Sequence, residues 1–336
     1  MSTPRAVIFG LSGPELTADE RAFFAEADPW GFILFARNVA APDQLRRLTG
    51  ALREAVGREA PILIDQEGGR VARMRAPHWR EWPRLPDFCA RLPDAAVLTG
   101  LRLRHRLIAH ELRAVGIDVN CAPMVDVARP DADPIIADRA LGDRAGPVAR
   151  RGRAAAEALL EGGVLPVVKH VPGYGRATLD AHRALPVTDA PLDALEEDFA
   201  PFRALADMPM MMTAHMIYRA IDPERCATVS PDCIALIRRR IGFDGLLMTD
   251  DIGMEALSGP VPQRAAEAIA AGCDVALHCN GDLAQMRQVA ARTPLLAGDA
   301  LRRAEAALAR RRAPAPFDPD EADRRHAYLN QERADV

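Results

Sequence analysis

The sequence predicts an α/β protein, a single (β/α)8 barrel of the TIM type with long loops at its C-terminal face. Eight short apolar runs alternate with segments of helical periodicity along most of the 336 residues. Continuous apolar strands joined by helical crossovers are typical of a parallel sheet covered on both faces. An open doubly wound sheet would normally carry a GxGxxG loop after its first strand, whereas this chain has GLSGPE at 10–15. Eight such units therefore favour a closed barrel.

Each element is predicted from its apolar pattern and from the residues that begin or end it. Gly116, Gly242 and Gly272 end helical segments, and Ser230 before Pro231 begins one. The expected strands are 6–9, 31–35, 61–64, 117–122, 165–168, 210–213, 245–249 and 274–278. The expected helices are 17–27, 43–56, 98–115, 148–161, 192–206, 231–241, 263–271 and 283–291.

The domain organisation follows from where these units stop. Residues 1–312 are expected to form the catalytic barrel, and the charged, proline-containing stretch 313–336 a C-terminal extension without a second domain. Two stretches, 74–94 and 123–146, are too long for a short loop and follow strands. Both are therefore expected at the C-terminal face, where barrels of this type build their active sites.

Composition excludes several classes of partner. The formal net charge of -4 gives no reason to expect a nucleic acid or an anionic membrane surface. No apolar run approaches the ~20 residues that span a bilayer, and the N-terminus lacks the apolar core of a signal peptide. We therefore expect a cytoplasmic monomer. The six cysteines form no CxxC pair and no metal-binding spacing, so they are expected to be small buried hydrophobes.

The stretch KHVPGYGRATLDAH at 169–182 is the most informative part of the chain. It starts at the end of a strand with Lys169 and His170, and proline and glycines then break regular structure. Asp180 and His182 lie two residues apart in that loop, a spacing that lets a carboxylate reach an imidazole nitrogen. Such an aspartate fixes the histidine tautomer and stabilises the imidazolium. This cluster predicts a catalytic site at one end of the barrel.

Polar residues follow the other predicted strands as well, and in a barrel they would surround the same opening. Acidic and basic groups are mixed there, without an aromatic stripe or a phosphate-binding loop. This mixture suits a neutral polyhydroxylated ligand held by bidentate hydrogen bonds. These residues are Arg37, Asn38, Asp65, Gln66, Glu67, Arg70, Arg73, Asn120, Asp126, Asp138, Arg139, Lys169, His170, His215, Thr249, Asp250, Asp251, His278 and Asn280.

Several of these residues also allow a purely structural interpretation. For Asp126 a turn or a helix cap is the favoured reading, and for Glu67 a pair with a nearby arginine. His215 and His278 suit a core histidine as well as a site residue. Asp250 and Asp251 are adjacent and face opposite ways in an extended chain, so only one of them can point directly into the opening.

Four motifs in this order resemble glycoside hydrolase family 3, in its single-domain bacterial β-N-acetylglucosaminidase branch: IDQEGGRVARM, ADRALGD, KHVPGYGRATLDAH and LLMTDDIGM. The resemblance covers roughly residues 5 to 300. It implies that Asp250 is the nucleophile and that His182, paired with Asp180, is the general acid/base. It implies no cofactor and no metal, since a carboxylate nucleophile needs neither. The residues that it implies bind the N-acetylglucosamine unit are Asp65, Arg73, Arg139, Lys169 and His170.

The resemblance also implies a substrate, N-acetylglucosaminyl-1,6-anhydro-N-acetylmuramyl peptides taken up during cell-wall recycling. This chain departs from the family pattern KHxPGHG, because Tyr174 stands in place of the second histidine, and Val171 in place of the usual phenylalanine. The departure concerns loop packing and contacts on the substrate side. The alternatives are a relative that uses phosphate or acts on another β-glycoside, or a non-catalytic sugar-binding protein.

Overall fold

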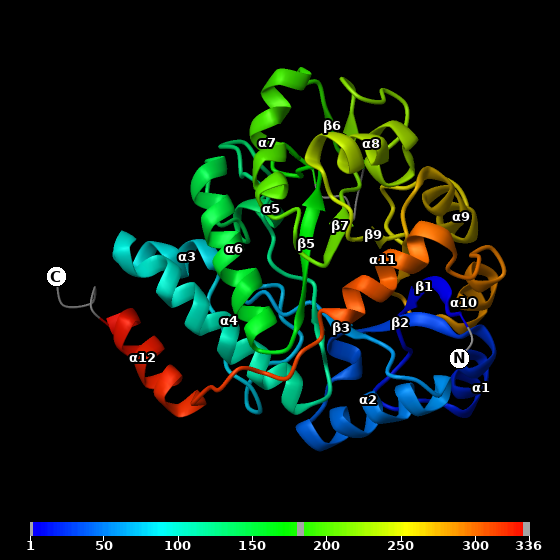
Figure 1. Cartoon of the computed structure of the whole chain (residues 1–336), viewed down its shortest axis with the longest axis horizontal. Coiled ribbons are helices and arrows are strands. Elements are labelled where there is room, and N and C mark those ends of the chain that lie inside the picture. Colours follow the sequence, from blue (N-terminus) through cyan, green and yellow to red (C-terminus); the bar gives the residue numbers. More distant parts are fainter. Residues whose placement is uncertain (1–2, 180–184, 332–336) are drawn as a thin grey trace.

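The computed structural model describes residues 3–179 and 185–331, and it confirms the predicted barrel (Figure 1). Eight parallel strands close in the order β1-β10-β9-β7-β5-β4-β3-β2. Every predicted strand is present within a few residues of its expected bounds. The barrel strands are β1 (Arg5–Phe9), β2 (Pro29–Leu34), β3 (Ile62–Ile64), β4 (Val119–Asn120), β5 (Leu165–Val171), β7 (Met210–Thr213), β9 (Leu246–Asp251) and β10 (Val275–His278).

Helices surround the barrel, and all eight predicted ones are present. The π-helical turn Ile237–Ile241 continues α8, so that together they span the predicted helix. The helices are α1 (Ala18–Ala27), α2 (Pro42–Val56), α3 (Leu85–Arg91), α4 (Val97–Ala114), α5 (Pro134–Ala137), α6 (Ala145–Glu161), α7 (Leu192–Ala204), α8 (Pro231–Leu236), α9 (Val261–Ala271), α10 (Leu283–Ala290), α11 (Gly298–Ala309) and α12 (Pro319–Gln331).

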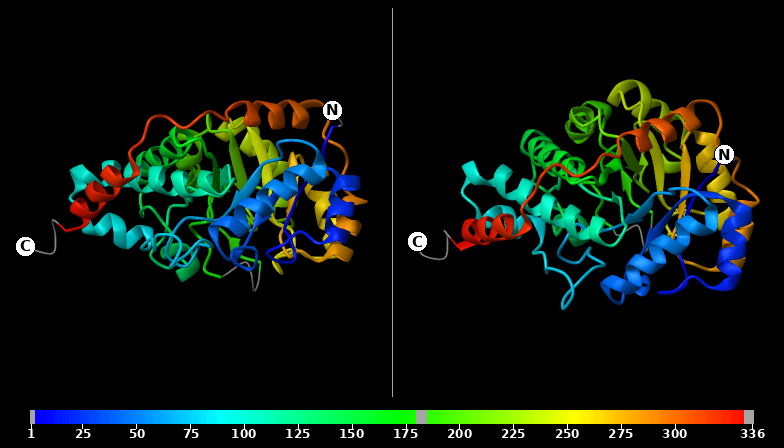
Figure 2. Two further views of the ribbon diagram at one scale, coloured as in Figure 1. Left: turned by 90° about the horizontal axis from the view of Figure 1, so that it is seen from below. Right: turned by 60° about the horizontal axis from the view of Figure 1, so that its bottom comes forward.

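Four of these helices and one small sheet were not predicted. Helices α3 and α5 lie within the two long stretches after β3 and β4, and α11 precedes the expected extension. Within that extension α12 packs against α4 at the edge of the molecule, as both views of Figure 2 show. The strands β6 (Val187–Thr188) and β8 (Ile217–Tyr218) pair in parallel outside the barrel.

Because side chains alternate along each strand, the core has one layer inside the barrel and one layer outside it. In β9, Leu246 and Met248 belong to the cluster that fills the barrel, whereas Leu247 packs in the layer outside it. The pairing of β9 with β10 then shifts register between Met248 and Asp251, at the end of the strand that carries Asp250. There the carboxylate of Asp250 faces the barrel opening, whereas that of Asp251 binds backbone N–H groups of neighbouring loops.

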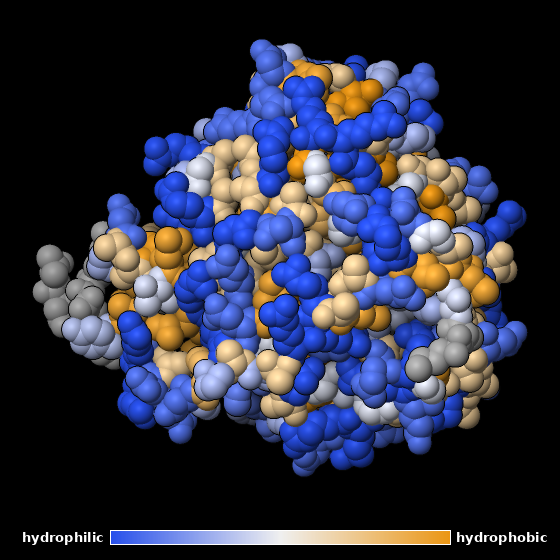
Figure 3. Space-filling model, in the orientation of Figure 1, coloured by the Kyte–Doolittle hydropathy of each residue, from blue (hydrophilic) through white to orange (hydrophobic). Residues whose placement is uncertain are grey.

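The surface and the cysteines complete this description. Each of the six cysteines is a buried free thiol, which confirms their predicted role as small hydrophobes. Among the helices of the described ranges, none is long and apolar enough to cross a membrane. On the face shown in Figure 3 hydrophilic residues prevail, and apolar residues form separate groups.

Asp274, just before β10, holds the end of the barrel opposite to the predicted site. Its carboxylate accepts a hydrogen bond of 2.8 Å from the backbone N–H of Leu247 and pairs with Arg238 at 2.7 Å and Arg303 at 3.2 Å. The side chain of Asp274 is 2% exposed. One buried anion therefore joins two strands, the turn after α8 and helix α11.

Replacing Asp274 by alanine should lower the free energy of unfolding by about 3–5 kcal/mol, because it leaves the guanidinium of Arg238 and a buried N–H without their partner and removes one of the carboxylates that pair with Arg303. The matched control is Asp299→Ala, because Asp299 also pairs with Arg303 but is 70% exposed. Its loss should cost less than about 1 kcal/mol. Urea unfolding of both variants measures the difference, and equal losses would contradict the role given to Asp274.

Candidate active site

A cavity of about 140 Å³ opens among the C-terminal ends of the barrel strands. Its polar lining comes from β5, β9 and the loops after β3 and β4, and its apolar lining from other strands and from the segments that follow β3, β4 and β9. The lining residues are Ile33, Phe35, Asp65, Val71, Arg73, Ile135, Arg139, Lys169, His170, Met212, Asp250, Asp251, Met254, Leu277 and Cys279. This is the end of the barrel at which the sequence predicted a site.

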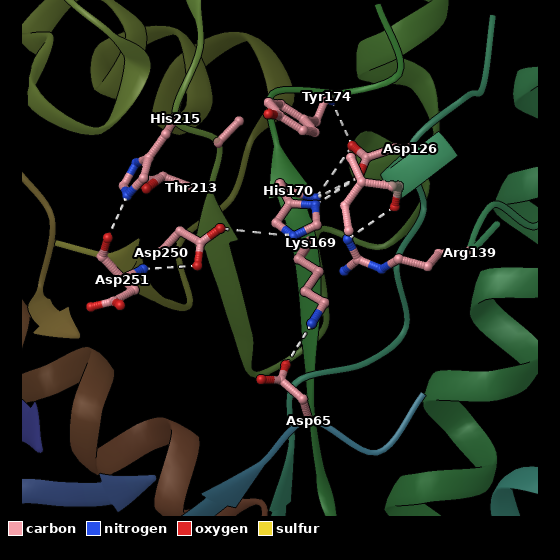
Figure 4. A network of polar contacts seen from close by, with 12 residues as sticks. Asp65, Asp126, Arg139, Lys169, His170, Tyr174, Thr213, His215, Asp250 and Asp251 are labelled. Atoms are coloured by element: carbon pink, nitrogen blue, oxygen red, sulfur yellow. Dashed lines mark hydrogen bonds and ion pairs between the residues drawn. The ribbon is translucent and has the colours of Figure 1, made fainter. Parts of the chain in front are cut away.

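The ammonium group of Lys169 lies between two carboxylates. It is 2.8 Å from Oδ1 of Asp65 (Figure 4). It is also 2.7 Å from Oε1 of Glu67. Arg139 binds Glu67 through both carboxylate oxygens, at 2.8 and 3.0 Å, and Arg73 binds Oδ2 of Asp65 at 3.1 Å. Three cations and two anions thus form one cluster, which leaves a net positive charge next to the cavity.

Burial and pairing set the protonation states of this cluster. Burial raises the pKa of Glu67, but Arg139 and Lys169 outweigh it and lower that pKa to about 2. The charges of Lys169 and Arg73 likewise overcome burial and hold the pKa of Asp65 far below its ordinary range. For Lys169, burial lowers the pKa and the two carboxylates raise it above its ordinary range. All three groups are therefore charged at neutral pH.

The backbone of Glu67 is held in place as well. Arg104, buried among Trp82 and Phe88, donates a hydrogen bond of 2.9 Å to the carbonyl oxygen of Glu67. The next residue, Gly68, has φ +107°, and a Cβ there would lie 2.0 Å from Nη2 of Arg104. Only glycine fits this turn, so the local sequence fixes where the carboxylate of Glu67 points.

His170 is oriented by Asp126. Oδ2 of Asp126 lies 2.8 Å from Nδ1 of His170, while Oδ1 accepts the backbone N–H of Tyr174 at 2.6 Å. The carboxylate of Asp126 is fully buried. The favoured reading of Asp126 as a turn or cap residue was therefore wrong, because its main partner is a histidine 44 positions away. The other ring nitrogen of His170 is left to face the cavity and Asp250 (Figure 4).

Asp250 and Asp251 have different surroundings, as their adjacency in an extended strand predicted. Oδ1 of Asp250 accepts the backbone N–H of Asp251 at 2.8 Å, and Oδ2 lies 3.9 Å from Nε2 of His170, beyond hydrogen-bonding distance. Asp251 instead ties loops together, since its Oδ1 accepts the backbone N–H groups of Gly253 and Cys279. Burial raises the pKa of Asp250, but the charges of His170 and His215 outweigh it and lower that pKa. Asp250 is thus an ionised carboxylate with one oxygen directed at the cavity.

The structure brings six of the eight predicted site residues together around this cavity. They are Asp65, Arg73, Arg139, Lys169, His170 and Asp250. Asp180 and His182, predicted as the acid/base pair, lie outside the described residues. Glu67 does pair with an arginine, but the expected local pair was wrong, because the partner Arg139 is 72 residues away in the sequence.

Other polar residues at the strand ends support the loops. Arg37 donates to the carbonyl oxygen of Leu11 at 2.7 Å, and Gln66 accepts the backbone N–H groups of Arg73 and Met74 at 2.9 and 3.1 Å. The apolar lining, including Ile135 and Met254, was not predicted from the sequence. In the sequence, these two residues could be recognised only by their closeness to the motifs that contain Arg139 and Asp250.

A family model described as the glycosyl hydrolase family 3 N terminal domain matches residues 10–304. The chain belongs to glycosyl hydrolase family 3. This confirms the resemblance drawn from the motifs and makes the protein a glycoside hydrolase. Among the described residues of this family 3 hydrolase, no group of three or more His, Cys, Asp or Glu side chains could hold a metal ion.

Relatives of this family 3 hydrolase carry more specific names. It is 40% identical over 287 residues to a protein named beta-hexosaminidase from Alkalilimnicola ehrlichii, covering 82% of this chain and 80% of that one. It is 38% identical over 281 residues to a beta-hexosaminidase from Methylococcus capsulatus, with coverages of 81% and 82%. Its structure is similar to that of NagZ from Neisseria gonorrhoeae in complex with N-trifluoroacetyl-D-glucosamine, with a TM-score of 0.86, 28% identity and 98% coverage of both chains.

The charge cluster predicts how stability depends on pH. Because the folded-state pKa of Glu67, about 2, lies below the unfolded value of ~4.3, its ionised form stabilises the fold above ~pH 4.3. That contribution is lost as the pH falls towards 2. Glu67→Gln should therefore cost several kcal/mol at pH 7 and progressively less between pH 5 and pH 3.

Urea unfolding of the wild type and Glu67→Gln across this pH range measures the difference. The control is Glu197→Gln, since Glu197 also pairs with an arginine, Arg129, but is 44% exposed. That pair should contribute less than about 1 kcal/mol at any pH. A cost of Glu67→Gln that stays constant from pH 7 to pH 3 would show that its charge is not what stabilises the cluster.

Proposed function

We propose that this hydrolase is a retaining exo-β-N-acetylglucosaminidase. Its substrates would be N-acetylglucosaminyl-1,6-anhydro-N-acetylmuramyl peptides, cleaved in the cytoplasm during peptidoglycan recycling. The observation that carries the proposal is the ionised Asp250, with one carboxylate oxygen tethered and the other directed at a cavity rich in charged hydrogen-bonding groups. The names of the relatives, beta-hexosaminidase and NagZ, support an N-acetylated hexosamine as the sugar.

Asp250 is the proposed nucleophile. In the first step its free oxygen, Oδ2, bonds to the anomeric carbon while the bond from that carbon to the leaving oxygen breaks. In the second step water attacks the anomeric carbon and the carboxylate of Asp250 leaves again. A nucleophile must be ionised before it reacts, and the lowered pKa of Asp250 meets that requirement at neutral pH.

His182 is the proposed general acid/base, with Asp180 as its partner. Both assignments rest on the family motif, because the two residues lie outside the described ranges. In the first step His182 would donate a proton to the leaving oxygen, and in the second it would take a proton from the attacking water. An imidazole with a reference pKa of ~6.5 can serve in both directions near neutral pH.

The charge cluster is the proposed binding site for the sugar hydroxyl groups. Both oxygens of Asp65 are engaged, by Lys169 and Arg73, which fixes the plane of this carboxylate. Each oxygen keeps a further lone pair, so Asp65 can accept hydrogen bonds from two adjacent hydroxyls while the cations donate to the hydroxyl oxygens. Arg139 and His170 line the same cavity and complete the proposed set.

Tyr174, the departure from the family motif, packs beside His170. The two ring centroids are 5.7 Å apart, and the backbone N–H of Tyr174 binds the same carboxylate, Asp126, that orients the imidazole. The tyrosine ring is 6% exposed. We therefore assign Tyr174 to packing of the loop behind His170 and not to proton transfer.

Incubation with a slow fluorinated N-acetylglucosaminide should trap a covalent glycosyl-enzyme on Asp250, because fluorine slows breakdown of the intermediate. Peptide mass spectrometry locates the added sugar. Asp250→Ala should give no adduct and no turnover, while Asp251→Asn keeps the proposed nucleophile and serves as the matched control. An adduct on Asp251 in the wild type would overturn the assignment.

His182→Ala should lower turnover of the anhydromuramyl disaccharide peptide by ~10²–10⁴-fold, because its alkoxide leaving group needs a proton. An activated aryl N-acetylglucosaminide needs little protonation, so its first step should suffer much less. Steady-state and burst kinetics on both substrates make the comparison. Equal losses on the two would contradict the acid role, and a wild-type enzyme inactive on the disaccharide would contradict the proposed substrate.

A further inference from the structure

Behind Asp250, the buried side chain of His215 belongs to a network with four other polar groups. Nε2 of His215 lies 2.9 Å from the carbonyl oxygen of Asp251, and Nδ1 lies 2.7 Å from Oγ1 of Thr228. That hydroxyl also lies 2.7 Å from Oγ1 of Thr213 and 3.2 Å from the carbonyl oxygen of Ala214. Figure 4 shows the imidazole of His215 next to the end of β9 that carries Asp250 and Asp251.

Counting protons in this network constrains the charge of the ring. A carbonyl oxygen only accepts hydrogen bonds, so Nε2 must carry a proton to bond to Asp251. Thr228 has a single hydroxyl proton for its three neighbours. If that proton goes to Ala214 or to Thr213, Nδ1 of His215 must donate as well, and the ring is an imidazolium.

A neutral ring requires the third arrangement, in which Thr228 donates to Nδ1. The carbonyl oxygen of Ala214 then loses its bond from Thr228. When the proton goes to Ala214 instead, Thr213 and His215 both donate to Thr228, and every one of the four contacts is a hydrogen bond. The arrangement that satisfies the whole buried network therefore protonates both nitrogens of His215.

The charges around the ring favour the same state. Three groups face it: the thiol of Cys226, in the segment before Thr228, which hydrogen-bonds to the side chain of His215, and the carboxylate of Asp250 and the carbonyl of Asp251, both from β9. Burial lowers the pKa of His215, but these groups outweigh it and raise the pKa to about 9. His215 in turn lowers the pKa of Asp250. A buried positive charge and the proposed nucleophile thus stabilise each other.

We propose that His215 is a positioning residue that remains an imidazolium throughout the reaction and keeps Asp250 ionised and aligned. Its Nε2–H group fixes the carbonyl of Asp251, whose N–H group tethers Asp250. The charge would also favour departure of the Asp250 carboxylate in the second step. This inference rests on the proposed role of Asp250 as nucleophile.

The protonation state can be read directly in the free enzyme. With ¹⁵N-labelled histidine, the signals of His215 are assigned by their loss in His215→Gln. Both ring nitrogens should be protonated at pH 7, with a titration near pH 9. A single protonated nitrogen at pH 7 would overturn the proposal. This measurement does not depend on enzyme activity, so its result holds whichever residue is the nucleophile.

Variants of Thr228 and Thr213 test the consequence for catalysis. Thr228→Val removes the acceptor for Nδ1–H and should favour the neutral ring, which raises the pKa of Asp250. The acidic limb of kcat/KM should then move up by about 1 pH unit, as expected when a nearby opposite charge is lost. Thr228→Ser keeps the hydroxyl and should therefore retain the pH profile of the wild type.

Thr213→Val is the matched control, because the Thr213 hydroxyl touches Thr228 but not the ring. Its pH profile should be that of the wild type. An unchanged profile in Thr228→Val, with the ring shown to be neutral in that variant, would refute the link to Asp250. If Thr228→Val does not fold, the protonation state of His215 in the wild type decides whether the proposal holds. Labelling of a residue other than Asp250 would refute the proposed nucleophile while leaving the imidazolium result intact.

Discussion

The ammonium of Lys169 lies between the carboxylates of Asp65 and Glu67, and the charges of both carboxylates depend on this contact. Two carboxylates this close would repel each other, and one would take up a proton if the cation were absent. With Lys169 buried between them, and Arg139 and Arg73 on their outer sides, both remain ionised. The cavity therefore presents fixed charged hydrogen-bonding groups before any ligand arrives, and such preorganisation lowers the cost of binding and of reaction.

The barrel fold brings these charged residues, which are far apart in the sequence, together at one opening. Side chains alternate along a strand, so Lys169, which follows Val167 in β5, continues an inner row and reaches the opening. Asp250 reaches the same opening at the end of β9, where the pairing with β10 shifts register. Groups on the other rows become supports. Asp251 ties two loops, and Asp126 holds both His170 and the segment that begins at Tyr174. Binding groups and supporting groups thus come from the ends of the barrel strands and from the loops that follow them.

The sequence predicted the barrel and most of the cavity because both depend on local patterns. Apolar runs mark the strands, and polar residues at their ends mark the opening. What it missed depends on tertiary contacts or on elements too short to show a period. Strands β6 and β8 have two residues each, and α11 buries little more than two alanines, Ala304 and Ala307. Nothing near Asp126 in the chain indicates that its partner is His170, and nothing in the run around Thr228 indicates its contact with His215.

We propose that the charge cluster holds the sugar so that its anomeric carbon faces Asp250. A crystal structure with bound N-acetylglucosamine would show this orientation. Hydroxyl groups should contact Asp65, Lys169 and Arg73, and the anomeric carbon should lie next to Oδ2 of Asp250. A sugar bound in the same cavity with its anomeric carbon turned away from Asp250, or one that does not contact Asp65 and Lys169, would contradict it.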